Sequence, residues 1–413
     1  MLQNLEQTYL DLFFQLQKQQ WENYANNAGH DLDQTNHAIY ALLDAAQQQE
    51  QFQGRKAAVW QAIISKGKVE NHPAVAALRN RLDNWDNYAT ETALIDWQEE
   101  RLSLARNMRA DVLELLELRQ RLAQEQGFAS YVDLALASED LSRATVLPLI
   151  EQYLHTNLPR AQALVQKYQI SWSSWFSDLE TLGRTTIKDN NKTELAASLL
   201  HELGLSTLQK GLTIVSKPAG FAGYTGVLQP AADVRILIDE NASLSGLLIL
   251  GHELGHAIAH LCNKNSGLFL TWTTSFDESM AVLLEQIAAR LWLSPEQRQL
   301  ARDIWTLEGV RCSLSFLFEL ALWEHPEQAE THYLKHYSPL GLDLGDPAIW
   351  ALDSFRSIDP VYIYSYVLGD VVAQRTLVRL ESLYGANYRA WGAWLVEHYF
   401  ALGREQSLPE KML

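Results

Sequence analysis

The sequence predicts a mainly α-helical protein with one small β-sheet, and the spacing of its apolar residues supports this prediction. From residue 1 to about residue 205, apolar side chains mostly recur every three or four positions, as at Val112, Leu115 and Leu122. Between residues 206 and 240 the chain is instead rich in glycine and β-branched residues, which is typical of strands and tight turns. A helical pattern then resumes and continues to the C-terminus.

The small sheet is expected in the glycine-rich segment. Its clearest strand contains Val234, Ile236 and Ile238, which alternate with residues of the opposite face. Ser243 follows and is expected to cap the next helix, because serine is a favoured N-cap residue. On this basis we divide the chain into an N-terminal helical half, residues 1–205, and a C-terminal half, residues 206–413, which carries the sheet and the motifs described below.

Composition and charge exclude several classes of partner. The chain has 413 residues, a formal net charge of -17 and no run of Lys or Arg, which opposes binding to nucleic acid or to an anionic membrane surface. No stretch of about 18 uncharged apolar residues is present to span a bilayer. The N-terminus lacks the basic start and apolar run of a secretory signal, and two cysteines are too few for a disulfide framework. We therefore expect a cytoplasmic protein.

The stretch GHELGHAIAH, residues 251–260, contains the H-E-x-x-H pattern. On a helix, His252 and His256 stand one turn apart on one face, and both can reach a zinc ion at about 2.0–2.1 Å. Glu253 lies beside the metal, where it can act as a general base toward a zinc-activated water that attacks a carbonyl. The alternative is an ordinary helix with structural histidines, which the full five-residue pattern disfavours. The sequence thus predicts one Zn²⁺ per chain.

A third ligand must come from elsewhere in the chain. His260 is too far from His252, because eight residues span about 12 Å along a helix; we expect it to be structural or to contact a ligand residue. In SFDESMAVLLEQ, residues 275–286, Glu278 is the predicted ligand, although Ser275 and Glu278 also form a capping-box pattern that would give Glu278 a purely structural role. Glu285, two turns further on, is placed to orient a ligand histidine, and the alternative is an exposed helical glutamate.

These motifs together resemble the thimet oligopeptidase and oligoendopeptidase F family of zinc peptidases, which are gluzincins. KPAGFAGYTG and DVRILIDENAS are similar to its Gly-rich segment and substrate-binding edge strand, HELGHAIAH to its metal helix, FDESMAVLLE to its third-ligand helix, and DPVYIYSYVLG to its tyrosine-rich segment. The resemblance implies a zincin-type helical fold with a small β-sheet beside the metal helix and a deep substrate cleft. It also implies substrate-binding residues, which are Gly220, Gly223, Tyr224, Ile236 and Ile238.

The resemblance further implies that a tyrosine hydroxyl stabilises the tetrahedral intermediate, and it leaves Tyr362, Tyr364 and Tyr366 as candidates. If this segment is helical, Tyr362 and Tyr366 share a face and Tyr364 points elsewhere. The chain departs from the family at Ala259, where a histidine is common, and near Arg356, where the family tends to carry a catalytic histidine. Arg356 is therefore either a cationic partner of the oxyanion or substrate carboxylate, or a surface arginine.

The sequence accordingly predicts a zinc-dependent metallopeptidase that cuts oligopeptides rather than folded proteins. A carboxypeptidase is the neighbouring alternative, with Arg356 or Lys217 as the cation for a terminal carboxylate. An alternative from another class is a non-catalytic peptide-binding or scaffold protein with a structural zinc. Glu253 and the tyrosines disfavour that alternative, because a structural zinc site needs no general base.

Overall fold

The computed structural model describes residues 2–47, 54–91, 97–184, 191–218, 222–240, 243–265 and 273–411. The protein is mainly helical and contains a small three-stranded mixed sheet, so the predicted fold class is confirmed. The chain forms two compact units from segments that are far apart in the sequence. Unit 1 comprises Met1–Gln51, Phe176–Trp305 and Leu368–Leu413, and unit 2 comprises Phe52–Trp175 and Thr306–Val367. The organisation into halves at residues 205 and 206 stays a prediction.

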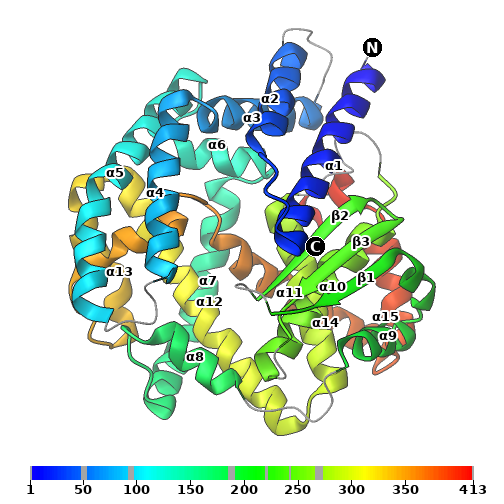
Figure 1. Cartoon of the computed structure of the whole chain (residues 1–413). Coiled ribbons are helices and arrows are strands. Elements are labelled where there is room, and N and C mark those ends of the chain that lie inside the picture. Colours follow the sequence, from blue (N-terminus) through cyan, green and yellow to red (C-terminus); the bar gives the residue numbers. More distant parts are fainter. Residues whose placement is uncertain are drawn as a thin grey trace. The chain divides into compact units, whose positions relative to one another are not determined.

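Helices make up most of both units (Figure 1). Helices with most or all of their residues in unit 1 are α1 (Leu2–Asn26), α2 (Asp33–Gln47), α8 (Trp175–Gly183), α9 (Lys192–Glu202), α10 (Leu244–Cys262), α11 (Thr274–Trp292), α15 (Tyr388–Leu395) and α16 (Leu408–Lys411). Those of unit 2 are α3 (Gly54–Glu70), α4 (Pro73–Glu91), α5 (Trp97–Glu125), α6 (Tyr131–Ser138), α7 (Arg143–Tyr168) and α13 (Ala329–Tyr337). Two long helices contribute residues to both units: α12 (Pro295–Glu324) and α14 (Tyr364–Tyr384).

The sheet belongs to unit 1 and has the strand order β1-β3-β2. Its strands are β1 (Leu212–Ser216), β2 (Gly223–Gln229) and β3 (Asp233–Ile238). β3 pairs in parallel with β1 and antiparallel with β2, so the prediction that DVRILIDE is an edge strand is wrong. Both sides of β3 are occupied by neighbouring strands, and the two outer strands of the sheet are β1 and β2. A peptide therefore has no free edge to pair with at Ile236 or Ile238.

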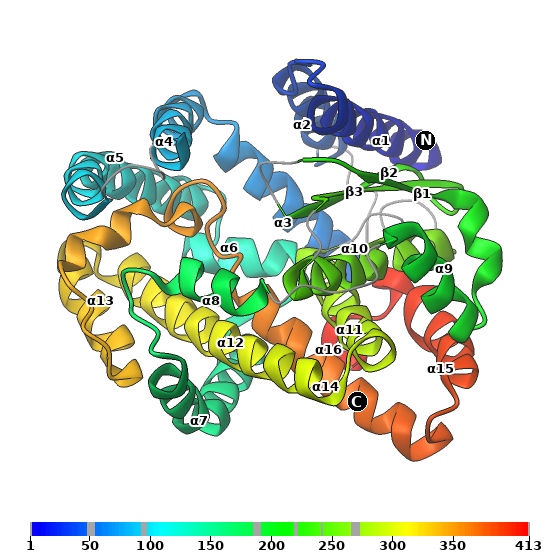
Figure 2. The same cartoon turned by 60° about the horizontal axis from the view of Figure 1, so that its bottom comes forward.

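The two faces of the sheet are covered by different helices, α10 on one side and α1 on the other (Figure 2). Side-chain alternation explains this arrangement, because successive residues of a strand point to opposite faces. Thr225 of β2 contacts Glu253 of α10, whereas its neighbour Tyr224 stacks on Trp21 of α1 with ring centroids 6.3 Å apart. The metal-motif helix is thus laid directly against one face of the sheet.

Helices α10 and α11 lie in close contact because two glycines remove side-chain bulk between them. A Cβ atom added at Gly255 would lie 2.6 Å from the Cα of Ala281, and one at Gly251 would lie 2.9 Å from the Cβ of Ala288. Such separations are shorter than normal van der Waals contact between carbon atoms. These glycines, each of which directly precedes a histidine of GHELGH, therefore let the backbones approach, which brings the α10 histidines near the α11 carboxylates.

The starts of these two helices are set by caps. Ser243 is the N-cap of α10 and accepts a hydrogen bond from the backbone N–H of Gly246 at 3.0 Å, as predicted. α11 begins earlier than the capping-box pattern indicates, because Thr273 is its N-cap and accepts from the N–H of Phe276 at 3.2 Å. Ser275 and Glu278 both lie inside the helix. The capping-box alternative for Glu278 is therefore wrong.

Among the described residues, no helix has both the length and the apolar character needed to cross a bilayer. Cys262 and Cys312 are buried free thiols.

Candidate metal centre

Three side chains from α10 and α11 converge in unit 1. His252, His256 and Glu278 each offer one donor atom, and these atoms all lie within 4.8 Å of one another. Nε2 of His252 is 3.4 Å from Oε2 of Glu278. Two donors that each lie about 2.0–2.1 Å from a tetrahedral zinc ion are separated by about 3.3 Å. Two imidazoles and one carboxylate at this spacing fit a zinc ion and leave a fourth position open, which is the ligand set of catalytic rather than structural sites.

A carboxylate lies behind the first histidine. Nδ1 of His252 is 3.3 Å from Oε2 of Glu285, and the other oxygen of Glu285 accepts a hydrogen bond from Nε1 of Trp305 at 2.6 Å. Glu285 is thereby fixed in orientation and is placed to hold the Nδ1–H tautomer of His252, which leaves Nε2 for a metal. This is the contact expected of a residue that orients a ligand histidine.

A second carboxylate, Asp277, lies behind the second histidine. Its Oδ1 is 2.9 Å from Nδ1 of His256 and 3.5 Å from Nε2 of His260. α10 runs without a break to Cys262, so His260 lies one turn beyond His256 and is not part of the convergent group. Asp277 thus links His260 to the metal centre.

Nearby carboxylates raise the pKa values of both histidines. Burial alone would lower the pKa of His256, but Asp277 outweighs it and raises that pKa to about 9. Burial opposes the charged form of His252 too, yet Glu278 and Glu285 hold its pKa well above the usual range. Both imidazoles are thus set in an anionic surrounding that suits a cation, and a divalent metal would replace these protons.

Glu253 is positioned by a contact with strand β2. Its Oε2 accepts a hydrogen bond from Oγ1 of Thr225 at 2.6 Å, and its side chain is buried. Gly223 leaves room for this carboxylate, because a Cβ atom there would lie 2.8 Å from Oε1 of Glu253. Thr225 and Gly223 share one face of β2 through the two-residue alternation of a strand.

The other predicted substrate-binding residues have different surroundings. Tyr224 points to the α1 face, and its hydroxyl is buried without a hydrogen-bond partner among the described residues. Ile236 and Ile238 are fully buried in the middle strand and serve the core. Gly220 lies outside the described residues. A substrate contact thus stays a prediction for Gly220, Gly223 and Tyr224.

Comparisons with solved structures identify the fold. The chain is similar to an M32 carboxypeptidase from Deinococcus radiodurans R1 (TM-score 0.68, 15% identity, covering 100% of this chain and 93% of that one). It is also similar to Pz peptidase A solved with an inhibitor (TM-score 0.69, 13% identity, 97% and 85% covered). A third match is a protein provisionally assigned as an oligoendopeptidase F from Bacillus anthracis strain Ames (TM-score 0.66, 14% identity, 97% and 84% covered).

The chain has a zincin-like peptidase fold. No protein-family model and no curated protein sequence matches it. Carboxypeptidases and oligopeptidases are both among the structures that share this zincin-like fold, so the fold alone does not distinguish their activities.

The tyrosine segment lies at the end of unit 2, where α14 begins at Tyr364. The rings of Tyr362 and Tyr366 are in contact with centroids 5.6 Å apart, whereas Tyr364 is only 1% exposed and packs against Phe316. Val361, just before this segment, has a φ of 57°, which is rare for a β-branched residue. Its N–H donates to Oε1 of Glu319 at 2.7 Å, which holds this backbone conformation.

Arg356 is not a surface residue, because only 1% of it is exposed. Its Nη2 lies 3.0 Å from Oδ2 of Asp353 and also contacts Ser315, and its Nη1 lies 3.5 Å from Oε2 of Glu319. Burial raises the pKa of Glu319 to about 7 despite this arginine. Arg356 is therefore paired with carboxylates of its own unit, which corrects the surface-arginine alternative and leaves its catalytic role as a prediction.

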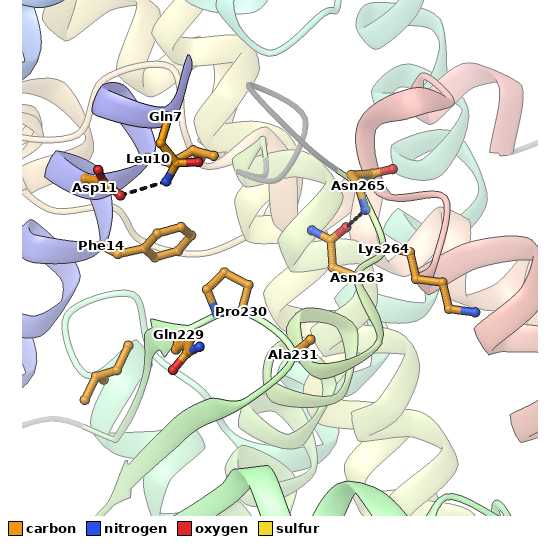
Figure 3. A pocket seen from close by; sticks show the side chains of 11 residues that line it. Gln7, Leu10, Asp11, Phe14, Gln229, Pro230, Ala231, Asn263, Lys264 and Asn265 are labelled. Carbon is orange, nitrogen blue, oxygen red and sulfur yellow. Dashed lines mark hydrogen bonds between the residues drawn. The ribbon is translucent and has the colours of Figure 1, made fainter. Parts of the chain in front are cut away.

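A separate pocket of about 680 Å³ lies in unit 1 among α1, the β2–β3 turn and the chain just after α10 (Figure 3). Side chains such as Asp11, Phe14 and Lys264 line it, and none of the convergent metal-binding candidates does. It therefore does not belong to the candidate metal centre.

Two contacts of this centre, those made by Asp277 and by Thr225, are not among the predictions from the sequence. A helical projection would have placed Asp277 beside Glu278 at the start of α11, but its partner is set by how α10 and α11 pack. Thr225 had a readable signal, because alternation in GYTG puts it on the same face as Gly223.

Proposed function

We propose that this protein is a zinc-dependent metallopeptidase that hydrolyses peptide bonds in oligopeptides, in the manner of the thimet oligopeptidase and oligoendopeptidase F family. The observation that supports this most directly is the convergence of His252, His256 and Glu278 in a zincin-like fold, with Glu253 next to the first ligand. The three donors leave a coordination position for a reacting group, which a catalytic site requires.

The chemistry follows from the roles that these residues are placed to take. A bound zinc ion supplies a Lewis acid that polarises the scissile carbonyl and lowers the pKa of a water molecule. Glu253 accepts the proton of the attacking water and later delivers it to the leaving nitrogen. Thr225 donates to one oxygen of Glu253 and so fixes the direction in which the other oxygen points. Glu285 and Asp277 keep the ligand histidines in the orientation that binds metal.

An outer strand is the proposed platform for an extended peptide. Main-chain pairing at a sheet edge recognises a peptide backbone without demanding a sequence. β3 cannot serve because it is central, but β2 is an outer strand and carries the Thr225 contact to Glu253. β2 is therefore the proposed substrate strand, in place of β3.

The contacts of two cations favour an oligopeptidase over a carboxypeptidase. Lys217 donates to the backbone carbonyls of Tyr24 and Ala25, at 3.3 and 2.6 Å, near the C-terminal end of α1. Arg356 is buried against carboxylates. Both side chains that the sequence offered for a terminal carboxylate are thus engaged elsewhere, and cleavage of internal bonds is the proposed mode.

The test combines a mixed peptide library with mass-spectrometric mapping of the cut bonds. The zinc-loaded protein is expected to cut internal bonds, whereas a carboxypeptidase would produce ladders from the C-terminus. Glu253→Gln preserves shape but removes the base, so it is expected to keep zinc and lose about 10²-fold or more of the activity.

Two results would count against the proposal. Activity of Glu253→Gln within about threefold of the wild type would remove this residue from the mechanism. Peptide binding without any cleavage by the zinc-loaded wild type would favour the non-catalytic scaffold alternative instead.

A further inference from the structure

A second group of histidines lies in unit 2, where α12 ends and α13 begins. His325 directly follows α12, the short 3₁₀ turn Pro326–Gln328 comes next, and His332 and His336 both lie on α13. The last two are four residues apart, which puts them one turn apart on the same helix face, as for His252 and His256. This cluster shares no residue with the candidate metal centre of unit 1.

His332 lies near both of the other histidines. Its ring centroid lies 6.0 Å from that of His325, with the two planes inclined by 20°, and 6.3 Å from that of His336. The corresponding distance for His252 and His256 is 5.0 Å. The rings of the second cluster are therefore further apart. Among the described residues, only the donors of the first centre all lie within 4.8 Å of one another, so side chains of the second cluster must rotate before their nitrogens can share one ion.

His332 has an unmet bonding requirement. Both of its ring nitrogens are buried, and neither has a hydrogen-bond partner among the described residues. A neutral imidazole carries one N–H donor and one lone pair, and leaving buried polar atoms unsatisfied is unfavourable. An ion bound to the lone pair would supply one of the two missing partners.

The two histidines of α13 have lowered pKa values. Burial, together with the positive charge of Lys335, lowers the pKa of His332 below its ordinary value and that of His336 to about 4. Both imidazoles are thus neutral near pH 7, and neutral imidazole is the metal-binding form. Glu327 adds a carboxylate whose Oε1 lies 3.5 Å from Nδ1 of His325.

We propose that His325, His332 and His336 form a second metal site that binds a divalent transition-metal ion such as Zn²⁺, Ni²⁺ or Cu²⁺. Imidazole ligands suit these ions, whereas Mg²⁺ and Ca²⁺ prefer oxygen. His325 and Glu327 have side chains that are 58% and 64% exposed, so they are free to move toward the ion, and Glu327 is placed to complete the ligand set. The ion would link the end of α12 to α13.

The experiment uses the full-length chain and Zn²⁺ as the probe, with stoichiometry measured against a competing chelator. The wild type is expected to bind two equivalents, the second with a Kd below about 10 μM. His332→Gln combined with His336→Gln is expected to lose one equivalent and keep the other. The matched control is His155→Gln with His398→Gln, which removes two histidines outside the cluster and is expected to retain both equivalents.

Glu278→Ala separates this site from the candidate metal centre, because it disables only the latter. One equivalent that persists in Glu278→Ala and disappears on adding the His332 and His336 substitutions supports the second site, even if the proposed peptidase site fails. The proposal is overturned if Glu278→Ala binds no zinc below about 0.1 mM, or if the double glutamine variant binds as much as the wild type. With Cu²⁺, the electron paramagnetic resonance signal of Glu278→Ala is expected to show coupling to imidazole nitrogens.

Discussion

At the scale of single residues, the hydroxyl of Thr225 is the contact that fixes Glu253. It donates to Oε2 of that glutamate at 2.6 Å from the neighbouring strand. Thr225→Val keeps the branched shape but removes the donor, so the carboxylate gains rotational freedom at the step where it must accept a proton. We expect kcat to fall about tenfold, since positioning of a general base is worth part of the 10²–10⁴-fold that the base itself contributes.

Thr225→Ser is the matched control, because it retains the hydroxyl and removes only a methyl group. It is expected to keep most of the activity, and both variants are expected to bind zinc as the wild type does. The measurement is kcat and KM on one peptide, together with zinc affinity. Equal activity of Thr225→Val and the wild type would show that Glu253 needs no such support.

The choice between Glu278 and His260 as the third ligand is also a residue-scale question. Oε2 of Glu278 lies 3.4 Å from Nε2 of His252, whereas Nε2 of His260 lies 3.5 Å from Oδ1 of Asp277 and is not part of the convergent group. Glu278→Ala leaves two protein ligands and is expected to weaken zinc binding by much more than the 10- to 100-fold typical of a lost residue that merely orients a ligand. His260→Ala is expected to cost no more than that amount.

Zinc titration of both variants against a competing chelator measures this difference, and circular dichroism checks that each is folded. If His260→Ala released the metal while Glu278→Ala retained it, the donor set proposed for this centre would be wrong.

At the scale of elements, the site depends on how closely α10 and α11 approach. At Gly255 an added Cβ meets backbone atoms of Met280 and Ala281, which cannot move without shifting α11. At Gly251 the nearest atom is the Cβ of Ala288 at 2.9 Å, which a second substitution can remove. Gly255→Ala is therefore expected to lower the free energy of unfolding by about 1–3 kcal/mol or more, as overpacking usually does, and to weaken zinc binding.

Gly251→Ala with Ala288→Gly supplies the control for this prediction. The double variant is expected to recover part of the stability that Gly251→Ala loses, whereas no side-chain change relieves the backbone clash at Gly255. Chemical denaturation measures stability and a chelator titration measures zinc binding. A Gly255→Ala variant as stable as the wild type would mean that the two helices have room to separate.

The elements also show which features were readable from the sequence. The histidine pair and the start of α10 depend on residues within one or two helical turns, so spacing and the Ser243 cap sufficed. The position of β3 depends on pairing with both β1 and β2, and alternation within one strand carries no information about its neighbours. Likewise, Ser275 and Glu278 matched a capping box, but the cap formed two residues earlier at Thr273.

At the scale of the whole molecule, each compact unit combines segments that are far apart in the sequence. Local composition therefore does not mark where a unit begins or ends. α12 and α14 continue through the positions where one unit gives way to the other. A helical pattern that runs unbroken gives no boundary signal. Each unit nevertheless contains a complete set of residues for its own proposed metal site, which makes the two sites testable separately.

The formal net charge of -17 predicts a preference between peptides that share one cleavable sequence but differ in the charge of their ends. A peptide with lysines at its ends, distant from the scissile bond, is drawn toward the protein at low ionic strength, whereas one with glutamates there is repelled. The ratio of their kcat/KM values is expected to be several-fold at about 10 mM salt, where the Debye length is about 30 Å, and to fall below about twofold at 1 M, where it is about 3 Å.

Because the effect acts on encounter, kcat at saturation is expected to be similar for both peptides, and a neutral-ended peptide supplies the salt control. A preference for lysine ends that persists unchanged in 1 M salt would instead indicate direct contacts in the binding site, and equal kcat/KM at low salt would show that the charge is too dispersed to steer substrates.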